Sequence, residues 1–301
     1  MDFDTFIDQA WTDHATDPAA VAARLQAQGL ALVADAQQLA GMAHLAHHVF
    51  GSHLARWQDG LQFQQQLAAL PCCVAGSIQA QAIARHISAL QLAGGLADDR
   101  AGMGASDRVR LNAMTANNLA EHDAGRAAAF LQAAMNEASE ANEADEAALP
   151  DTDPCHRALA IAGNNIAGTL EEKPALSASE VQLMIQAAQA GRKHWALAGT
   201  WLETERAEYR LALSWRKAGD FTQARQHAQN CLQIVQAQGH VPLEAFFAWV
   251  VLGQVEQAAG NAAGLTQALS HAESAFVGLD EGDRGWCQPS LDKLKAPADA
   301  A

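Results

Sequence analysis

The chain has 301 residues, of which 50% are apolar and 6% aromatic, and a formal net charge of −15 at pH 7. With 19 basic against 34 acidic residues, it lacks the concentrated positive charge that nucleic acids and anionic membranes require of a partner. Good helix formers such as Ala, Gln, Leu and Glu dominate, and strand-like runs of Val, Ile and Thr are almost absent. The composition therefore predicts an all-α protein of closely spaced helices.

Two features of the chain bear on its compartment. The acidic start lacks the basic segment and apolar run of a signal peptide, and no stretch approaches the roughly 18 to 20 apolar residues of a membrane span. The five cysteines follow no disulfide spacing, as expected of reduced thiols. They are Cys72, Cys73, Cys155, Cys231 and Cys287. We expect a cytoplasmic protein.

The N-terminal third has the pattern of successive helices. An apolar face from Phe3 to Trp11 has the spacing of one helix. Asp17-Pro18 combines a cap with a first-turn proline and predicts the start of a second helix. A third helix is expected from Leu30 to Phe50, and the pair Gly51-Ser52 is expected to break it.

Further periodic segments follow. We expect a partner helix from His53 to Leu70, another from Ile78 to Leu92, and then a loop to about Ser106. Residues 137–153 contain seven acidic residues and no basic one, which predicts a solvated loop or a frayed helix end.

Two pairs of repeats point to stacked helical hairpins. The segments Ala113–Ala120 and Ala160–Ala167 share an Asn-Asn-aliphatic-Ala ending and lie 47 residues apart. After a helix expected to end at Gly191, a second repeat runs from Glu208 to Phe276 and turns first at Gly219-Asp220 and then, 41 residues later, at Gly260-Asn261. Repeats of this length indicate a helical solenoid.

This second repeat resembles the tetratricopeptide-repeat (TPR) family. The family pattern W-x-x-L-G…A is matched at Trp249, Leu252 and Gly253, and by Ala224 in the preceding hairpin. The resemblance covers about residues 192–278. It implies a right-handed α-α superhelix, here of about six helical hairpins, in which small residues allow close helix contacts.

The resemblance also suggests how the chain is divided. We expect divergent TPR-like hairpins over residues 1–100 and clearer TPR-like repeats over 101–296. A capping helix at about Asp283–Lys295 should cover the last apolar face of the stack. Residues 297–301 are expected to be a disordered tail.

The TPR frame assigns two asparagines to a concave groove. If the Asn-Asn segments are aligned with the repeat, Asn117 and Asn164 occupy its fifth position, which faces the groove in proteins that resemble this family. An amide can hold the backbone of an extended peptide through its donor and its acceptor. In the alternative interpretation, the two side chains hydrogen-bond a neighbouring helix or a cap.

The same frame places Arg206, Tyr209 and Arg216 on the groove side. Arginine binds carboxylates through two parallel hydrogen bonds, and tyrosine adds a rigid aromatic surface, so the groove would suit an acidic or C-terminal peptide. The alternative is that these cations pair with acidic residues of their own helix, namely Glu203, Glu205 and Glu208. The basic clamp with which some TPR proteins hold chaperone tails is not reproduced, so that partner is not implied.

The most concentrated chemistry lies in the histidines His44, His47, His48 and His53. His44 and His48 share one helical face and could chelate a metal, with His53 as a third ligand. Because no carboxylate at helical spacing completes the set, an exposed His-rich face is the preferred interpretation and no metal is predicted.

Together these patterns predict a non-enzymatic scaffold that binds another protein or an extended peptide in the groove and needs no cofactor. Neither nucleic acid nor a membrane is an expected partner, and a homodimer through an end face stays open. One alternative is a regulatory protein that responds to a bound peptide. Another, of a different class, is a metal protein or enzyme that uses the histidine cluster.

Overall fold

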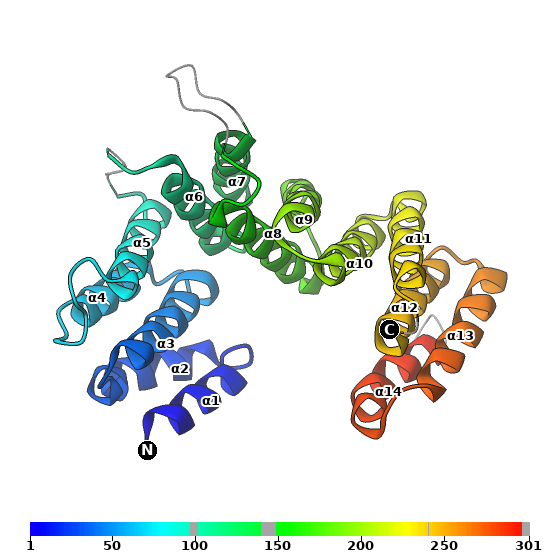
Figure 1. Ribbon diagram of the computed structural model, residues 1–301, viewed down its shortest axis with the longest axis horizontal. Helices are drawn as coiled ribbons and strands as arrows, with labels where there is room; N and C mark the ends of the chain where they lie inside the picture. Colours follow the sequence, from blue (N-terminus) through cyan, green and yellow to red (C-terminus); the bar gives the residue numbers. More distant parts are fainter. Residues whose placement is uncertain (97–101, 140–148, 240, 297–301) are drawn as a thin grey trace. The chain divides into compact units, whose positions relative to one another are not determined.

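A computed structural model describes residues 1–96, 102–139, 149–239 and 241–296 (Figure 1). Every regular element within these ranges is a helix, which confirms the all-α prediction. The expected tail at 297–301 and the centre of the acidic stretch lie outside the described residues. The chain divides into two compact units, Met1–Ala162 and Gly163–Ala301. The division by repeat type near residue 100 stays a prediction.

In the first unit, helices that follow one another in the sequence pack side by side (Figure 1). Its helices are α1 (Phe3–Asp13), α2 (Pro18–Arg24), η1 (Leu25–Gly29), η2 (Leu30–Leu32), α3 (Ala36–His47), η3 (His48–His53), α4 (Trp57–Ala68), α5 (Ile78–Ala93), α6 (Ala105–Leu119) and α7 (Ala124–Ser139). Helix α8 (Pro154–Glu172) begins in this unit and ends in the second.

The third helix begins at Ala36, six residues later than the predicted Leu30. The side chain of Asp35 accepts hydrogen bonds from the amides of Gln37 and Gln38, both at 2.8 Å, and so fixes the new start. The segment Leu30–Leu32 instead ends the preceding helix as a 3-10 turn.

The predicted break at Gly51-Ser52 is wrong, because the chain continues there as the π-helix η3. Gly51 is buried, and a Cβ atom at this position would lie 2.9 Å from Oδ1 of Asn118 and 3.1 Å from Cδ2 of Leu90. The glycine therefore allows α6 to approach η3 closely and does not form a turn. The chain turns only at Ala55, which has a left-handed φ of 49°.

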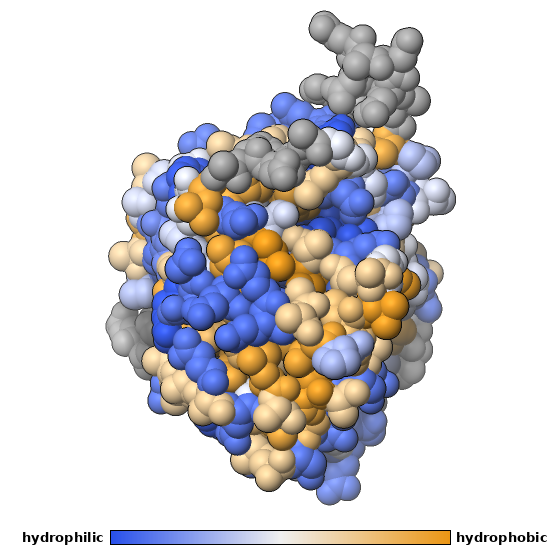
Figure 2. All heavy atoms as spheres, turned by 90° about the vertical axis from the view of Figure 1, so that its left-hand side faces the viewer, coloured by the Kyte–Doolittle hydropathy of each residue, from blue (hydrophilic) through white to orange (hydrophobic). Residues whose placement is uncertain are grey.

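The core of the first unit is built from aliphatic and phenylalanine side chains of α1 to α5. Phe6, Leu25, Leu39, Met42 and Phe50 are at most 1% exposed. On the face shown in Figure 2, hydrophobic and hydrophilic residues alternate in patches. Large apolar side chains remain exposed at Val74, before α5, and at Ile78, its first residue, which are 64% and 78% exposed.

The second unit continues with helical hairpins. After the end of α8 it comprises α9 (Ala178–Ala198), α10 (Trp201–Ala218), α11 (Phe221–Ala237), α12 (Pro242–Ala258), α13 (Ala262–Val277) and α14 (Glu281–Lys295). Helix α14 lies where the capping helix was expected. It inserts Cys287, Leu291 and Leu294 into a cluster with Phe246 and Val250 of α12.

The two clearest hairpins repeat the same backbone turn. Gly219 and Gly260 have φ angles of 83° and 69°, a region that L side chains rarely adopt. The residue after each glycine caps the next helix, and its backbone angles are nearly identical, φ −90° and ψ 84° at Asp220 and φ −89° and ψ 86° at Asn261. The sequence repeat of 41 residues is thus a repeat of local structure.

Small residues mark close helix contacts, as predicted for Ala224 and Gly253. Ala224 is fully buried, and a Cβ atom at Gly253 would lie 2.9 Å from both terminal methyl carbons of Leu294. A still closer contact is at Gly163 of α8, where a Cβ atom would lie 2.5 Å from the backbone oxygen of Ala187 and 2.7 Å from the amide of Gly191. Backbone atoms cannot move aside as a side chain can, so this contact requires glycine. Among the described helices, none has the length and apolar character needed to cross a membrane.

Candidate functional site

Two of the predicted groove residues take part in contacts between helices of the second unit. Nη2 of Arg206 donates to Oε1 of Glu244 on α12 over 2.6 Å, although the Arg206 side chain remains 59% exposed. Tyr209 packs edge-on against Phe247 of α12, with ring centroids 6.4 Å apart. Burial raises the pKa of Tyr209 to about 12, so its hydroxyl stays protonated.

Asn164 belongs to a second network. Nε of Arg210 donates to Oδ1 of Asn164 over 3.4 Å, and its Nη1 donates to Glu171 at the end of α8. Oγ of Ser214 donates to the other oxygen of Glu171 over 2.5 Å. The sequence indicated neither Glu171 nor Ser214, because both are brought to Arg210 by packing of α8 on α10.

Arg216, the third predicted cation, is half-buried on the last turns of α10. Its Nε atom is buried and has no hydrogen-bond partner among the described residues. The next residue, Lys217, donates to the backbone oxygen of Lys173. Arg206 and Arg210 therefore have carboxylate partners on other helices, whereas Arg216 keeps an unused donor.

Helix α10 also buries two acidic side chains. Oε1 of Glu208 accepts from Nε of Arg192 over 2.5 Å, and Oε2 contacts Nδ1 of His227 at 2.6 Å and Nδ2 of Asn230 at 3.1 Å. Burial alone would raise the pKa of Glu208, but the hydrogen bonds from His227 and Asn230 lower it. Glu205 has no such set of donors, and burial together with the carboxylate of Glu244 raises its pKa to about 8.

Asn117 lies in the first unit and contacts η3. Its Nδ2 donates to Oγ of Ser52 over 3.2 Å, and that hydroxyl in turn donates to Oδ1 of Asn118 over 3.2 Å. The backbone oxygen of Ser52 also lies 2.9 Å from Nε2 of His122. The hydrogen bond from Asn117 thus joins two helices, as in the alternative interpretation of this residue given above. It also holds the π-turn in place.

The four histidines of the predicted cluster lie in different surroundings. His44 is exposed on α3. His47 is buried and stacks on His86 with ring centroids 4.5 Å apart, and neither of its ring nitrogens has a hydrogen-bond partner among the described residues. Burial lowers the pKa of His86 to about 3 and holds that of His47 well below its usual value. This stacked pair is neutral at physiological pH.

The ring nitrogens that do gather belong to His14, His48 and His53, and all three lie within 4.8 Å of one another. His14 was missed in the sequence, because it is 34 residues before His48 and ends a different helix. The one local feature that could have drawn attention to His14 is its position three residues after Trp11, on the same helical face. Burial, with the neighbouring His53 and His14, lowers the pKa of His48 to about 3.

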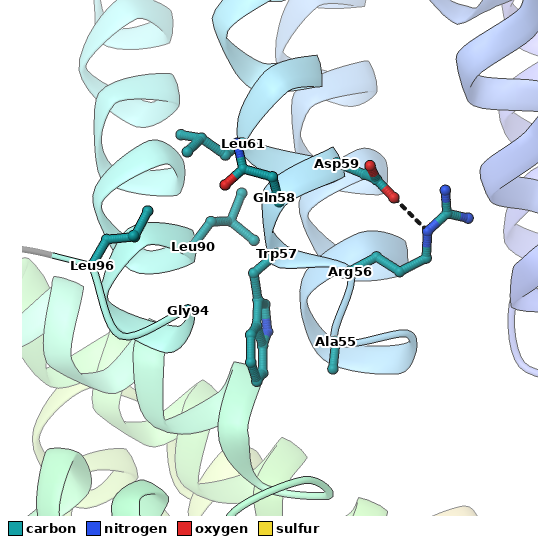
Figure 3. Close-up of a pocket in the computed structure, with 9 residues that line it drawn as sticks. All are labelled: Ala55, Arg56, Trp57, Gln58, Asp59, Leu61, Leu90, Gly94 and Leu96. Carbon is teal, nitrogen blue, oxygen red and sulfur yellow. Dashed lines mark hydrogen bonds and ion pairs between the residues drawn. The ribbon is translucent and has the colours of Figure 1, made fainter.

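A pocket of about 270 Å³ lies beside the start of α4 (Figure 3). Leu61 and Leu90 form part of its wall, and the ion pair between Nε of Arg56 and Oδ2 of Asp59 spans 2.6 Å at its edge. Trp57 donates from Nε1 to the backbone oxygen of Gly51 over 3.2 Å, which ties the pocket to η3. Among the described residues that line the pocket, Arg56 and Asp59 are the titratable ones.

Within its described residues the structure defines an all-α protein of helical hairpins, with part-buried ion pairs and a cluster of three histidines. Comparison with known protein families, with curated proteins and with solved structures found no match to the chain.

Proposed function

We propose that the chain is a TPR-like scaffold whose helical hairpins form a right-handed superhelix and bind an extended, acidic segment of a partner protein. The repeated turns at Gly219 and Gly260, with matching caps at Asp220 and Asn261, support the assignment to a repeat fold. The five free thiols fit the reducing cytoplasm in which we place the protein.

The observation that carries the proposed binding site is the unused donor of Arg216. A buried donor without a partner costs roughly 1 to 3 kcal/mol, and a ligand that accepts a hydrogen bond from Arg216 would remove that cost. Glu171 is already held by Arg210 and Ser214, and Glu244 is held by Arg206. A carboxylate of the partner would therefore be the natural acceptor for Arg216.

The surroundings of Arg216 suit a carboxylate ligand. Arg210 and Lys217 lie on the same helix. Arg210 binds Glu171, and Lys217 binds the backbone oxygen of Lys173. Tyr209 offers a rigid aromatic surface that is already fixed by Phe247. Since a bound acidic peptide would be held largely by charge, its affinity should fall as salt rises.

A displayed library of random peptides, selected on the full-length protein, tests this proposal. The enriched peptides should be acidic, and their affinity, measured by fluorescence anisotropy, should weaken between low and high salt. Arg216→Glu should reduce binding at least about tenfold, because it removes the donor and reverses the charge. Asn164→Ala should bind more weakly at an unchanged melting temperature.

The matched control is Lys293→Glu, the same change of charge at an exposed lysine on α14. It should leave peptide affinity unaltered. If Arg216→Glu retains the affinity of the wild-type protein, or if no acidic peptides are enriched, α10 is not the binding surface and the proposal is wrong.

A further inference from the structure

The imidazoles of His14, His48 and His53 converge at one point in the first unit. Their ring centroids are 5.1 Å apart for His14 and His48, 5.3 Å for His14 and His53, and 4.5 Å for His48 and His53. One nitrogen from each ring lies within 4.8 Å of the other two. All three side chains are half-buried, so solvent still reaches the cluster.

The closest pair of nitrogens has the spacing of two ligands on one ion. Nε2 of His48 and Nε2 of His53 are 3.0 Å apart. Imidazole nitrogens bind zinc at about 2.0 to 2.1 Å, so neighbouring ligands of one ion lie roughly 3.0 to 3.4 Å from each other. A direct N–H···N hydrogen bond between His48 and His53 would have a similar length. The position of the third ring, His14, therefore distinguishes a metal site from a hydrogen bond.

His14 is oriented as a ligand would be. Its Nδ1 lies 2.6 Å from the backbone oxygen of Trp11. A carbonyl oxygen can only accept, so Nδ1 carries the proton and Nε2 keeps a free lone pair. Metal-binding histidines commonly fix their orientation by this same hydrogen bond from the second nitrogen to a carbonyl.

The π-turn explains why His48 and His53 face each other. In η3 the amide of Leu54 donates to the oxygen of Val49, five residues earlier, over 3.2 Å. In this wider turn, residues five apart lie close to one face, whereas in an α-helix they point in different directions. Single π-turns occur frequently at functional sites.

The turn is held in position by contacts that need no metal. Ser52 is bound by Asn117 and Asn118 of α6 and by His122 in the turn that follows α6. The Trp11 ring covers one side of the cluster, with centroids 5.0 Å from His14 and 5.4 Å from His48. Rigid ligands beside an apolar side chain form the supporting shell that metal sites require.

We propose that His14, His48 and His53 bind a divalent late transition-metal ion of the Zn²⁺ type. Three neutral imidazoles suit this class of ion, whereas Mg²⁺ and Ca²⁺ prefer oxygen ligands, of which the cluster has none. The adjacent Asp13 is held by Arg24 over 2.7 Å. Three protein ligands leave a coordination position for water or for a further ligand. The site is separate from the proposed peptide surface and does not depend on it.

The test uses the tag-free, full-length protein after removal of metal with a chelator. Competition with a coloured chelator should show one tightly bound Zn²⁺ per chain, and Co²⁺ should give the visible absorption of a site with nitrogen ligands. His14→Gln, His48→Gln and His53→Gln should each lower the Zn²⁺ affinity at least about tenfold. Zn²⁺ should raise the melting temperature of the wild-type protein and of no ligand variant.

His44→Gln is the matched control. His44 lies four residues before His48 and its ring centroid is 5.5 Å from that of Trp11, but it is not among the three converging residues. This variant should retain the wild-type affinity. If His44→Gln lowers the affinity while His14→Gln retains the wild-type value, the metal site is the helical pair His44 and His48, and the proposed set is wrong.

A measurement on the wild-type protein covers the case in which a variant fails to fold. Among the 12 histidines, Zn²⁺ should shift the NMR resonances of three imidazole rings, those of His14, His48 and His53. A shift of any other set, or binding no tighter than that of a protein with all three residues changed to Gln, overturns the proposal. In that outcome the three rings are joined by hydrogen bonds and packing alone.

Discussion

The carboxyl group of Glu205 shares a buried site with that of Glu244, and the two residues are only 1% and 8% exposed. Glu244 accepts a hydrogen bond from Arg206 over 2.6 Å. Burial and the nearby negative charge of Glu244 raise the pKa of Glu205 to about 8, so Glu205 is protonated at neutral pH. The folded protein thus binds a proton that the unfolded chain would release.

This proton makes stability depend on pH. An unfolded glutamate titrates at about 4.3, so the contribution of Glu205 is fully present below that pH and is lost as pH rises through about 8. Between those values the free energy of unfolding should fall as pH rises, by up to about 1.4 kcal/mol per pH unit.

Glu205→Gln, which stays neutral, should flatten this dependence in urea unfolding measured from about pH 5 to pH 8. Glu273→Gln, at an exposed carboxylate on α13, should keep the wild-type slope. Equal slopes in all three proteins would contradict the assignment.

Gly163 should not tolerate even one additional methyl group. A Cβ atom there would lie 2.5 Å from the backbone oxygen of Ala187, so Gly163→Ala must separate α8 from α9. We expect a loss of at least about 2 kcal/mol in the free energy of unfolding. Gly285→Ala in α14 meets no atom within 4 Å and should be neutral or stabilise by up to about 1 kcal/mol. Thermal melts that shift alike for both variants would show that the α8–α9 contact is looser than described.

The ion pair between Arg225 and Glu256 should contribute more than an exposed pair. Nε and Nη2 of Arg225 bind the two oxygens of Glu256 at 2.6 and 2.7 Å, and Nδ2 of Asn261 adds a third bond at 2.8 Å. Glu256→Gln should cost about 2 kcal/mol, because it leaves the Arg225 cation without a compensating charge. The control Asp59→Asn breaks a pair whose side chains are each 39% exposed and should cost less than about 1 kcal/mol. Chemical unfolding of both variants measures the difference, and a smaller loss for Glu256→Gln would refute it.

The turn at Gly219 gives a test of the hairpin repeat. Its φ of 83° disfavours residues with a Cβ atom, and Gly219→Ala should destabilise the protein by about 1 kcal/mol. Gly219→Asn should cost less, since asparagine adopts the left-handed region more readily. Equal melting temperatures for the alanine variant and the wild-type protein would mean that the turn relaxes to another conformation.

The parts of the fold that could be predicted from the sequence are those with local causes. The cap-proline pair Asp17-Pro18 does open α2, and the periodic stretch from Ile78 gives α5. The Gly219-Asp220 and Gly260-Asn261 turns form as expected, because a left-handed glycine and a side-chain cap act within a few residues. The break predicted at Gly51 did not form. Glycine is needed there because Asn118 of another helix leaves no space for a Cβ atom.

The candidate sites could not be predicted in full, because their residues are brought together by helices that are distant in the sequence. Arg206 and Arg210 form ion pairs with Glu244 and Glu171, which lie on other helices. Likewise, the cluster at His48 is completed by His14 from the end of α1. Helical spacing identified His44 and His48 as a pair, but the π-turn instead directs His48 toward His53.

Helix α8 has a practical consequence for dissecting the protein. It runs without interruption from Pro154 to Glu172, and the division between the compact units falls inside it, after Ala162. A protease that needs an extended segment finds no cleavage site at that division. A fragment cut there would also end in half a helix with unpaired backbone groups. Separate expression of either unit should therefore retain the whole of α8.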